Sequence, residues 1–196
     1  MGVVEKNIIN SKSSAGFRLA QKCKDIKTQL YQIYSFEKYD NQSLISFLGV
    51  MNGGNDALAE VDCRISNQKN YKLSIYANSG LSKRISSSNS IPIAYVPNQE
   101  SRVFEQYTIR TTPKRDINSG SIPRIHDSEY KLLEYIARGL EFNSAAYGEI
   151  NLYTKLQPCL SCDIVFVNFT RMFPNIKIAV YYEKEYNTLT RGEGMI

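Results

Sequence analysis

The chain has 196 residues, of which 42% are hydrophobic and 22% are charged, and it carries a formal net charge of +5 at pH 7. This length and composition suit one domain with a short extension, and they exclude an intrinsically disordered protein. No apolar run approaches the ~18 residues of a membrane span, and the first residues lack the apolar stretch of a signal peptide. Four cysteines are too few for a disulfide scaffold.

The N-terminal quarter has a helical pattern. Residues 14–36 repeat apolar side chains at the spacing of one helix face, with lysine and glutamine on the other. This predicts an amphipathic helix packed against the core, with a partner-binding arm as the alternative. Residues 44–51 predict a second short helix that ends at Gly53 and Gly54. We therefore expect an N-terminal helical extension over residues 1–49 and a main domain over residues 50–196.

The pattern then changes to strands and loops. Alternating side chains over 57–65 and 71–77, on either side of a polar turn, predict a β-hairpin. Residues 82–101 are rich in serine, asparagine and proline, and we expect a loop there with one short strand at 91–96. The stretch 102–124 is basic, with Phe104 and Tyr107 among its charges. Such a stretch is usually a solvated loop, but it also has the composition that binds single-stranded nucleic acid.

The last third alternates helices with strands. Residues 128–140 form one apolar helical face, which Asp127 or Ser128 can cap. A strand is expected at 149–154, a helix from Cys162 to 173, and a strand at 176–182. This order implies a mixed α/β layer whose last strands are parallel.

Cys159 and Cys162 form a Cys-x-x-Cys motif where a strand ends and a helix begins. The helix dipole and first-turn N–H groups favour thiolates there, and two thiolates can bind Zn²⁺. Cys23 and Cys63 lie in apolar patterns and are expected in the core. With no second Cys-x-x-Cys and no histidine pair, a three-ligand site with an open position remains, which is the catalytic arrangement of zinc.

The start of the 128–140 helix offers the missing groups. A ligand followed at two residues by Glu, and later by Pro-Cys-x-x-Cys, is the signature of zinc deaminases. Here Glu129 holds the glutamate position and Pro158 precedes Cys159. Zinc lowers the pKa of its bound water toward ~7, and Glu129 is expected to move the protons.

The segment 126–182 resembles the bacterial polymorphic-toxin deaminases of the cytidine-deaminase-like superfamily. The resemblance lies in DSEYKLLEYIA, EINLYTKLQPCLSC and VNFTRMFPNIKIAVYY, and GGNDALAEV and IYANSG extend it to about residues 50–183. It implies a three-layer α/β/α sandwich with a mixed five-stranded sheet, one Zn²⁺, and hydrolytic deamination of cytosine. It also implies delivery into a rival cell and a cognate immunity protein.

One departure concerns the third ligand. The common superfamily motif is His-x-Glu, whereas the residue two before Glu129 is Asp127 and His126 lies one further away. The toxin branch often carries aspartate there, which favours Asp127. Imidazole with two thiolates is the commoner zinc set, so His126 stays the alternative.

Further site residues are expected from the resemblance and from composition. The substrate-binding candidates are Asn55, Asn78, Ser79, His126 and Ser161. The nucleic-acid-binding candidates are Tyr107, Arg110, Lys114 and Arg115. A turn-forming asparagine is the alternative interpretation of Asn55, and an ordinary turn is favoured over a binding role for Asn78 and Ser79.

We therefore expect a zinc-dependent deaminase domain over 50–196 that converts cytosine to uracil in nucleic acid, with DNA favoured over RNA. It is expected to be a monomeric toxin effector without membrane contact that acts in the target-cell cytoplasm and binds an immunity protein. The alternatives are a deaminase of free cytidine or nucleotides, a deaminase of adenine in RNA, and a noncatalytic zinc-stabilised module that binds nucleic acid.

Overall fold

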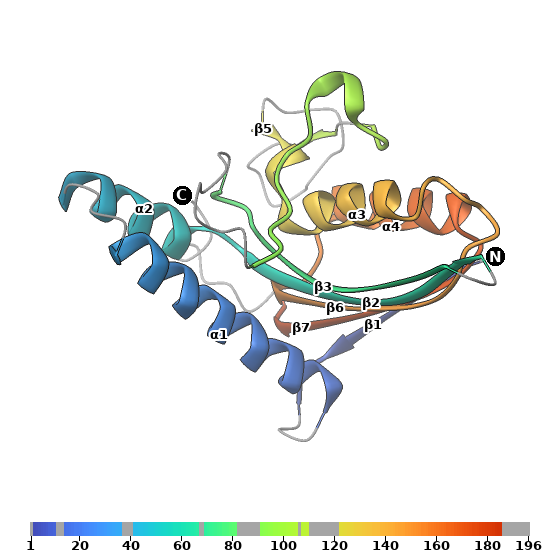
Figure 1. Ribbon diagram of the computed structural model, residues 1–196, viewed down its shortest axis with the longest axis horizontal. Helices are drawn as coiled ribbons and strands as arrows, with labels where there is room; N and C mark the ends of the chain where they lie inside the picture. Colours follow the sequence, from blue (N-terminus) through green and yellow to red (C-terminus); the bar gives the residue numbers. More distant parts are fainter. Residues whose placement is uncertain are drawn as a thin grey trace.

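The computed structural model describes residues 2–10, 14–36, 41–66, 69–81, 91–105, 107–109 and 122–185. These residues form a five-stranded mixed sheet with helices on both faces (Figure 1), which confirms the predicted α/β/α class. The helices are α1 (Ala15–Phe36), α2 (Asn41–Gly53), α3 (Ser128–Gly139) and α4 (Leu160–Met172). The sheet strands are β1 (Val3–Ile8), β2 (Asp56–Ser66), β3 (Lys69–Asn78), β6 (Tyr147–Leu156) and β7 (Asn175–Lys184).

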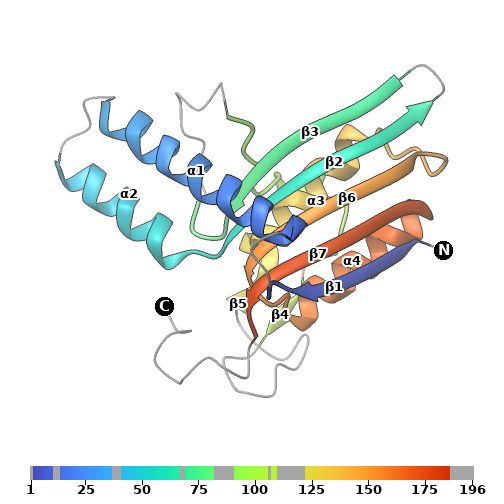
Figure 2. The same cartoon turned by 90° about the horizontal axis from the view of Figure 1, so that it is seen from below.

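The strand order of the sheet is β1-β7-β6-β2-β3. β2 pairs antiparallel with both β3 and β6, so the predicted hairpin is confirmed. β6 and β7 are parallel, as the helix–strand alternation of the last third predicts. β1 and β3 lie at the two edges of the sheet (Figure 2).

The two faces of the sheet carry separate cores. Ala57, Ala59, Val61 and Cys63 of β2 pack with α3 and α4. Leu58 points the other way, where it joins Cys23 and other buried residues of α1. β2 thus contributes side chains to both cores, because successive side chains of a strand point to opposite faces of the sheet.

The N-terminal region contributes more than the predicted helices. α1 covers the lower face of the sheet (Figure 1), and Lys27 Nζ donates to Asp56 Oδ2 and to the Met51 carbonyl, each at 2.8 Å. Before α1, β1 pairs parallel with β7. β1 is short and mostly exposed, so its side chains show no alternation that a sequence pattern can detect. The division at residue 49 stays a prediction, but β1 belongs to the same sheet as the strands that follow it.

The prediction of a short strand over residues 91–96 was wrong in extent. It is reduced to an isolated bridge between Ile93 and Tyr76, with Tyr76 N–H donating to the Pro92 carbonyl and Ala94 N–H to the Tyr76 carbonyl. Pro92 has no N–H to donate, so the pairing with β3 cannot extend toward residue 91. On the other side, the Asn78 carbonyl accepts from Lys131 Nζ and from Leu81 N–H.

The connection from β3 to α3 includes a small second sheet of β4 (Thr108–Ile109) and β5 (Ile122–Pro123). Two 3₁₀ turns, η2 (Gln99–Ser101) and η3 (Arg124–His126), flank it, and η3 leads directly into α3. Among the described residues, no helix is both long and apolar enough to cross a membrane.

Candidate metal centre and catalytic site

Two helix starts meet at the centre of the site. Asp127 is the N-cap residue of α3 and Cys159 is the N-cap residue of α4, with Cys162 in the first turn of α4. The two helices pack side by side on the upper face of the sheet (Figures 1 and 2). First-turn N–H groups and the helix dipole favour negative charge at both starts.

Asp127, Cys159 and Cys162 form one compact group of potential metal ligands. The two sulfurs lie 3.3 Å apart, and Asp127 Oδ2 lies 3.4 Å from Cys159 Sγ and 3.3 Å from Cys162 Sγ. Zinc binds thiolate sulfur at about 2.3 Å and carboxylate oxygen at about 2.0–2.2 Å, so tetrahedral ligands lie roughly 3.5–3.8 Å apart. The three groups therefore fit a zinc ion with small adjustments. Within the described residues, no fourth Cys, His, Asp or Glu joins them.

The three side chains of this group differ in the direction of their pKa shifts. A hydrogen bond with the Cys162 thiol, the Arg124 guanidinium and the Ser161 hydroxyl lower the pKa of Cys159 to about 4. The pKa of Cys162 is raised by its hydrogen bond with Cys159 and by burial, and the pKa of Asp127 is raised by burial and by the charge of Cys159. Three acidic groups in one buried place repel each other when all are ionised, and a divalent cation removes that repulsion.

Arg124 is a part of the site that the sequence placed only in a basic loop. Its Nε donates to Asp127 Oδ2 at 2.8 Å, and its Nη2 lies 3.4 Å from Cys159 Sγ. It thus touches two of the three potential ligands. The i,i+3 spacing from Arg124 to Asp127 across η3 is the only signal in the sequence, and it is too common to identify such a role.

Glu129 lies beside this group and outside it. Its side chain is 3% exposed, and its Oε1 accepts a hydrogen bond from Thr154 Oγ1 at 2.8 Å while Oε2 accepts one from Ser128 Oγ at 3.0 Å. Burial and the nearby Cys159 charge raise the pKa of Glu129. A buried carboxylate next to a metal site is a natural proton acceptor and donor.

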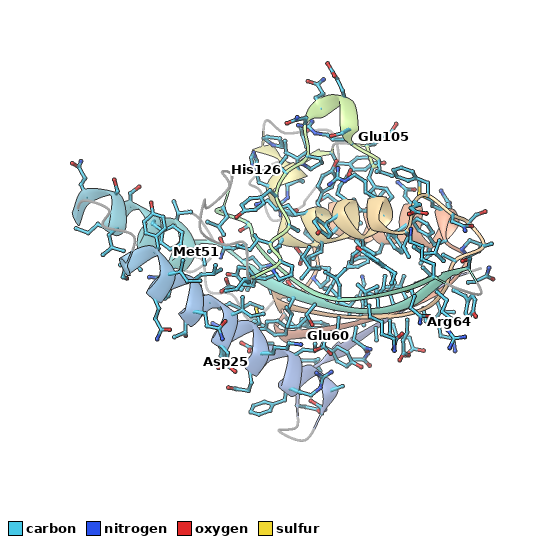
Figure 3. The ribbon with its side chains drawn as sticks, in the orientation of Figure 1. Asp25, Met51, Glu60, Arg64, Glu105 and His126 are labelled. Atoms are coloured by element: carbon cyan, nitrogen blue, oxygen red, sulfur yellow. The ribbon has the colours of Figure 1, made fainter. Side chains whose placement is uncertain are left out.

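His126, the alternative ligand, has an exposed side chain at the end of η3 (Figure 3). Partial burial and the positive charges of Lys131 and Arg102 lower its pKa. It does not belong to the group of potential ligands. The geometry therefore favours Asp127 over His126 as the third ligand.

The other predicted substrate-binding residues are engaged within the protein. Asn55 donates its side-chain amide to Ser128 and Thr154, with a longer contact of 3.4 Å to Glu129, and Ser79 Oγ accepts from the Asn55 backbone N–H. Asn78 is fully buried, and its amide donates to Asp56 and to the Met51 carbonyl. The Ser161 hydroxyl lies 2.8 Å from Cys159 Sγ.

Of the predicted nucleic-acid-binding residues, Tyr107 is the one that the structure describes. It is partly exposed and lines a small pocket with Arg124, Asp127 and Cys162, so it lies next to the potential ligands. Its hydroxyl donates to Glu105, which lies above α3 and α4 in the view of Figure 3. Arg110, Lys114 and Arg115 lie outside the described residues.

A buried lysine supports the site from α3. Lys131 has no exposed surface, and its Nζ donates to the carbonyls of Asn78 and Leu81 at 2.8 and 2.7 Å. Burial lowers the pKa of Lys131 to about 8. Its contacts tie the turn after β3 to the helix that carries Glu129.

A mixed sheet between helical layers, with an aspartate and two cysteines at neighbouring helix starts, is the arrangement expected of a deaminase domain of the cytidine-deaminase-like superfamily. The model of the Toxin-deaminase family, described as the BURPS668_1122 family of deaminases, matches residues 38–184. The chain therefore belongs to this family of toxin deaminases, and it is a hydrolytic deaminase. No curated protein and no solved structure shows significant similarity to the chain.

Proposed function

We propose that the chain is a zinc-dependent deaminase that converts cytosine to uracil in nucleic acid, with DNA favoured over RNA, and that it acts as an interbacterial toxin effector. The observation that carries this proposal is the group formed by Asp127, Cys159 and Cys162 beside the buried carboxyl of Glu129. Two thiolates and one carboxylate leave one corner of a tetrahedral zinc site for water, as in catalytic zinc sites.

The proposed mechanism is a hydrolysis in which Glu129 handles every proton. When bound, zinc supplies a water whose pKa is lowered toward ~7. Glu129 accepts a proton from the attacking water and delivers it to the ring nitrogen. It then takes the second proton, from the hydroxyl now bound to the ring carbon, and passes it to the leaving amine. Oxygen replaces the amino group on the ring carbon, ammonia leaves, and the base becomes uracil.

The polymer substrate is supported by composition. The chain has a net charge of +5, and its stretch 102–124 combines basic and aromatic side chains. A cytosine inside a duplex must leave the stack to reach such a site, at a cost of a few kcal/mol. Single-stranded DNA is therefore the expected preferred substrate, with an activity that falls as salt rises.

The decisive experiment compares Glu129→Gln with Glu134→Gln. Glu134 is a second buried glutamate of α3, but its carboxylate accepts from the backbone N–H groups of Val103 and Phe104. Purified proteins are incubated with single- and double-stranded DNA and RNA and with free cytidine, and products are read by sequencing and chromatography. Metal content is measured in parallel.

We expect the wild-type protein and Glu134→Gln to convert C to U in single-stranded DNA. Glu129→Gln should lose at least about 100-fold in activity, since general acid–base catalysis contributes 10²–10⁴-fold, while its metal content stays the same. Activity on free cytidine alone, or on adenine in RNA, would contradict the proposed substrate and identify that compound as the substrate instead. A loaded metal site with no product from any base would support a noncatalytic module.

The remaining proposals concern partners and location. We propose that the chain, as a member of a toxin-deaminase family, is an effector that acts in the cytoplasm of a target cell and is inhibited by a cognate immunity protein. We propose that the enzyme acts as a monomer. Size-exclusion chromatography coupled to light scattering measures the mass, and a stable dimer at working concentration would contradict the monomer.

A further inference from the structure

We propose that Asn55 and Thr154 are positioning residues that orient Glu129 through a relay of hydroxyl groups, instead of contacting the substrate. The proposal rests on the proposed function, because it assigns these residues a role only through the proton transfers of Glu129. It replaces the substrate-binding role that the sequence suggests for Asn55, and it gives Thr154 a role that the sequence does not indicate.

The relay starts at the side-chain amide of Asn55. Its Nδ2 donates to Thr154 Oγ1 at 2.8 Å and to Ser128 Oγ at 3.0 Å, and a longer contact of 3.4 Å leads to Glu129 Oε1. Its Oδ1 accepts from the Leu156 backbone N–H at 3.2 Å, which fixes which end of the amide faces the hydroxyls. The amide has two N–H groups, and the two short contacts use both.

The direction of the two hydroxyl protons follows from this arrangement. A hydroxyl has one proton to give, and here each hydroxyl oxygen already accepts from Asn55. The proton of Thr154 is therefore free for Glu129 Oε1, at 2.8 Å, and the proton of Ser128 for Oε2, at 3.0 Å. One amide thus directs one donor to each oxygen of the carboxyl group.

Such a pair of donors has a catalytic consequence. Hydrogen bonds to both oxygens hold the carboxyl plane against rotation. A small misplacement of a catalytic group can cost about 100-fold in rate.

The backbone of Asn55 is itself held in place. Asn55 N–H donates to Ser79 Oγ at 2.7 Å, and Ser79 N–H donates to the Asn55 carbonyl at 2.9 Å. The buried Lys131 fixes the same turn through the carbonyls of Asn78 and Leu81. The side chain of Asn55 is therefore bound on every polar atom, with no donor left for a sugar or a base.

The experiment compares Thr154→Val, which removes the hydroxyl at nearly constant shape, with Thr154→Ser, which retains it. The matched control is Thr170→Val, because Thr170 is a buried threonine of α4 whose hydroxyl donates to the Val167 carbonyl. Steady-state kcat and KM on a cytosine-containing single-stranded oligonucleotide are measured, together with bound metal and thermal midpoint. Asn55→Ala is measured in the wild-type and in the Glu129→Gln background, where oligonucleotide affinity is the readout.

We expect Thr154→Val to lower kcat about 10- to 100-fold with KM and metal content within twofold, and Thr154→Ser to recover most of the loss. Asn55→Ala should lower kcat in the same way, and in the Glu129→Gln background it should leave oligonucleotide affinity within twofold. A kcat of Thr154→Val within twofold of wild type, or a loss of affinity in Asn55→Ala/Glu129→Gln, would overturn the inference alone. An inactive wild-type protein would overturn the proposed function and this inference with it.

Discussion

Charged side chains on the two faces of the sheet differ in their burial and in their ion pairing. On the α1 face, Arg18 and Lys22 pair with Glu60, which lies between the sheet and α1 in Figure 3, and all three side chains keep some contact with solvent. On the α3–α4 face, Glu129 and Lys131 are almost completely buried and do not pair with each other. Surface pairs cost little, whereas isolated buried charges are expensive.

This difference separates elements that hold the fold from elements that hold the site. The ion pairs on the α1 face hold α1 against the strands, and replacing their members should change the stability of the fold slightly. Charge on the α3–α4 face is buried around Asp127, Cys159 and Glu129. Replacing it should change metal binding or catalysis at the site residues, and should lower stability strongly at Lys131, which supports the site. Four substitutions test this separation.

The largest effect is expected from Cys159→Ser. Loss of one thiolate from a three-ligand site should remove the metal and lower activity at least about 100-fold. Cys23→Ala is the control from the other face, because Cys23 is a buried residue of α1, and the substitution is expected to leave the metal in place. Metal analysis after dialysis against a weak chelator checks both, and a Cys159→Ser protein that retains one equivalent of metal would contradict the assignment.

Arg124→Gln should weaken metal binding without removing it. The guanidinium offsets the negative charge of two thiolates and a carboxylate, and residues around metal ligands typically contribute 10- to 100-fold in affinity. We expect about a 10-fold loss, measured by chelator competition, with partial recovery in Arg124→Lys. Arg138→Gln is the control, because Arg138 contacts Glu134 and the Ser101 carbonyl away from the ligands. Unchanged affinity in Arg124→Gln would show that its contacts are structural.

Lys131→Met should act mainly on stability. The substitution removes the Lys131 donor from the Leu81 carbonyl and leaves the Asn78 carbonyl with the Leu81 N–H alone, and we expect a loss of about 3 kcal/mol in the free energy of unfolding. The control Lys72→Met removes an exposed pair with Asp62 and should cost less than about 1 kcal/mol. Chemical denaturation measures both, and equal losses would contradict the contrast between faces.

Glu60→Gln should give the smallest effect and a clear pH signature. Hydrogen bonds from Arg18 and Lys22 lower the pKa of Glu60 from 4.5 to about 2. A folded-state pKa below the unfolded value stabilises the fold above pH 4.5, and this contribution is lost as the pH falls from 4.5 toward 2. With solvent screening we expect about 1 kcal/mol at neutral pH. The melting curves of the two proteins should converge at acid pH, and a constant difference would argue against the pairing.

The sequence indicates the layers of this fold better than it indicates the details of its site. The helix over 14–36 and the helix over 128–140 are predicted because a helix that packs on a sheet must show a 3.6-residue apolar repeat. Cys159 and Cys162 can be found because metal-binding chemistry requires a fixed short spacing. In contrast, β1 pairs in the sheet with β7, at the other end of the chain, and no local pattern in the sequence indicates this partner.

The missed site residues share one cause. Arg124 and Thr154 act through contacts with residues far away in the sequence or across a turn, and neither belongs to a motif. Asn55 was found at the correct end of its strand, but its partners decide what its amide does. Position along the chain can suggest that a polar side chain lies in a site, and only the packing shows what it faces.

The pairing of the first strand with the last one also has a kinetic meaning. Val3 lies opposite Lys177, and β7 separates β1 from β6, so β1 has no strand to pair with until β7 is in place. Contacts between such distant segments slow folding, because the intervening chain must first be ordered. While the chain is being synthesised, the sheet therefore stays open on the β6 side until residues 175–184 have emerged from the ribosome.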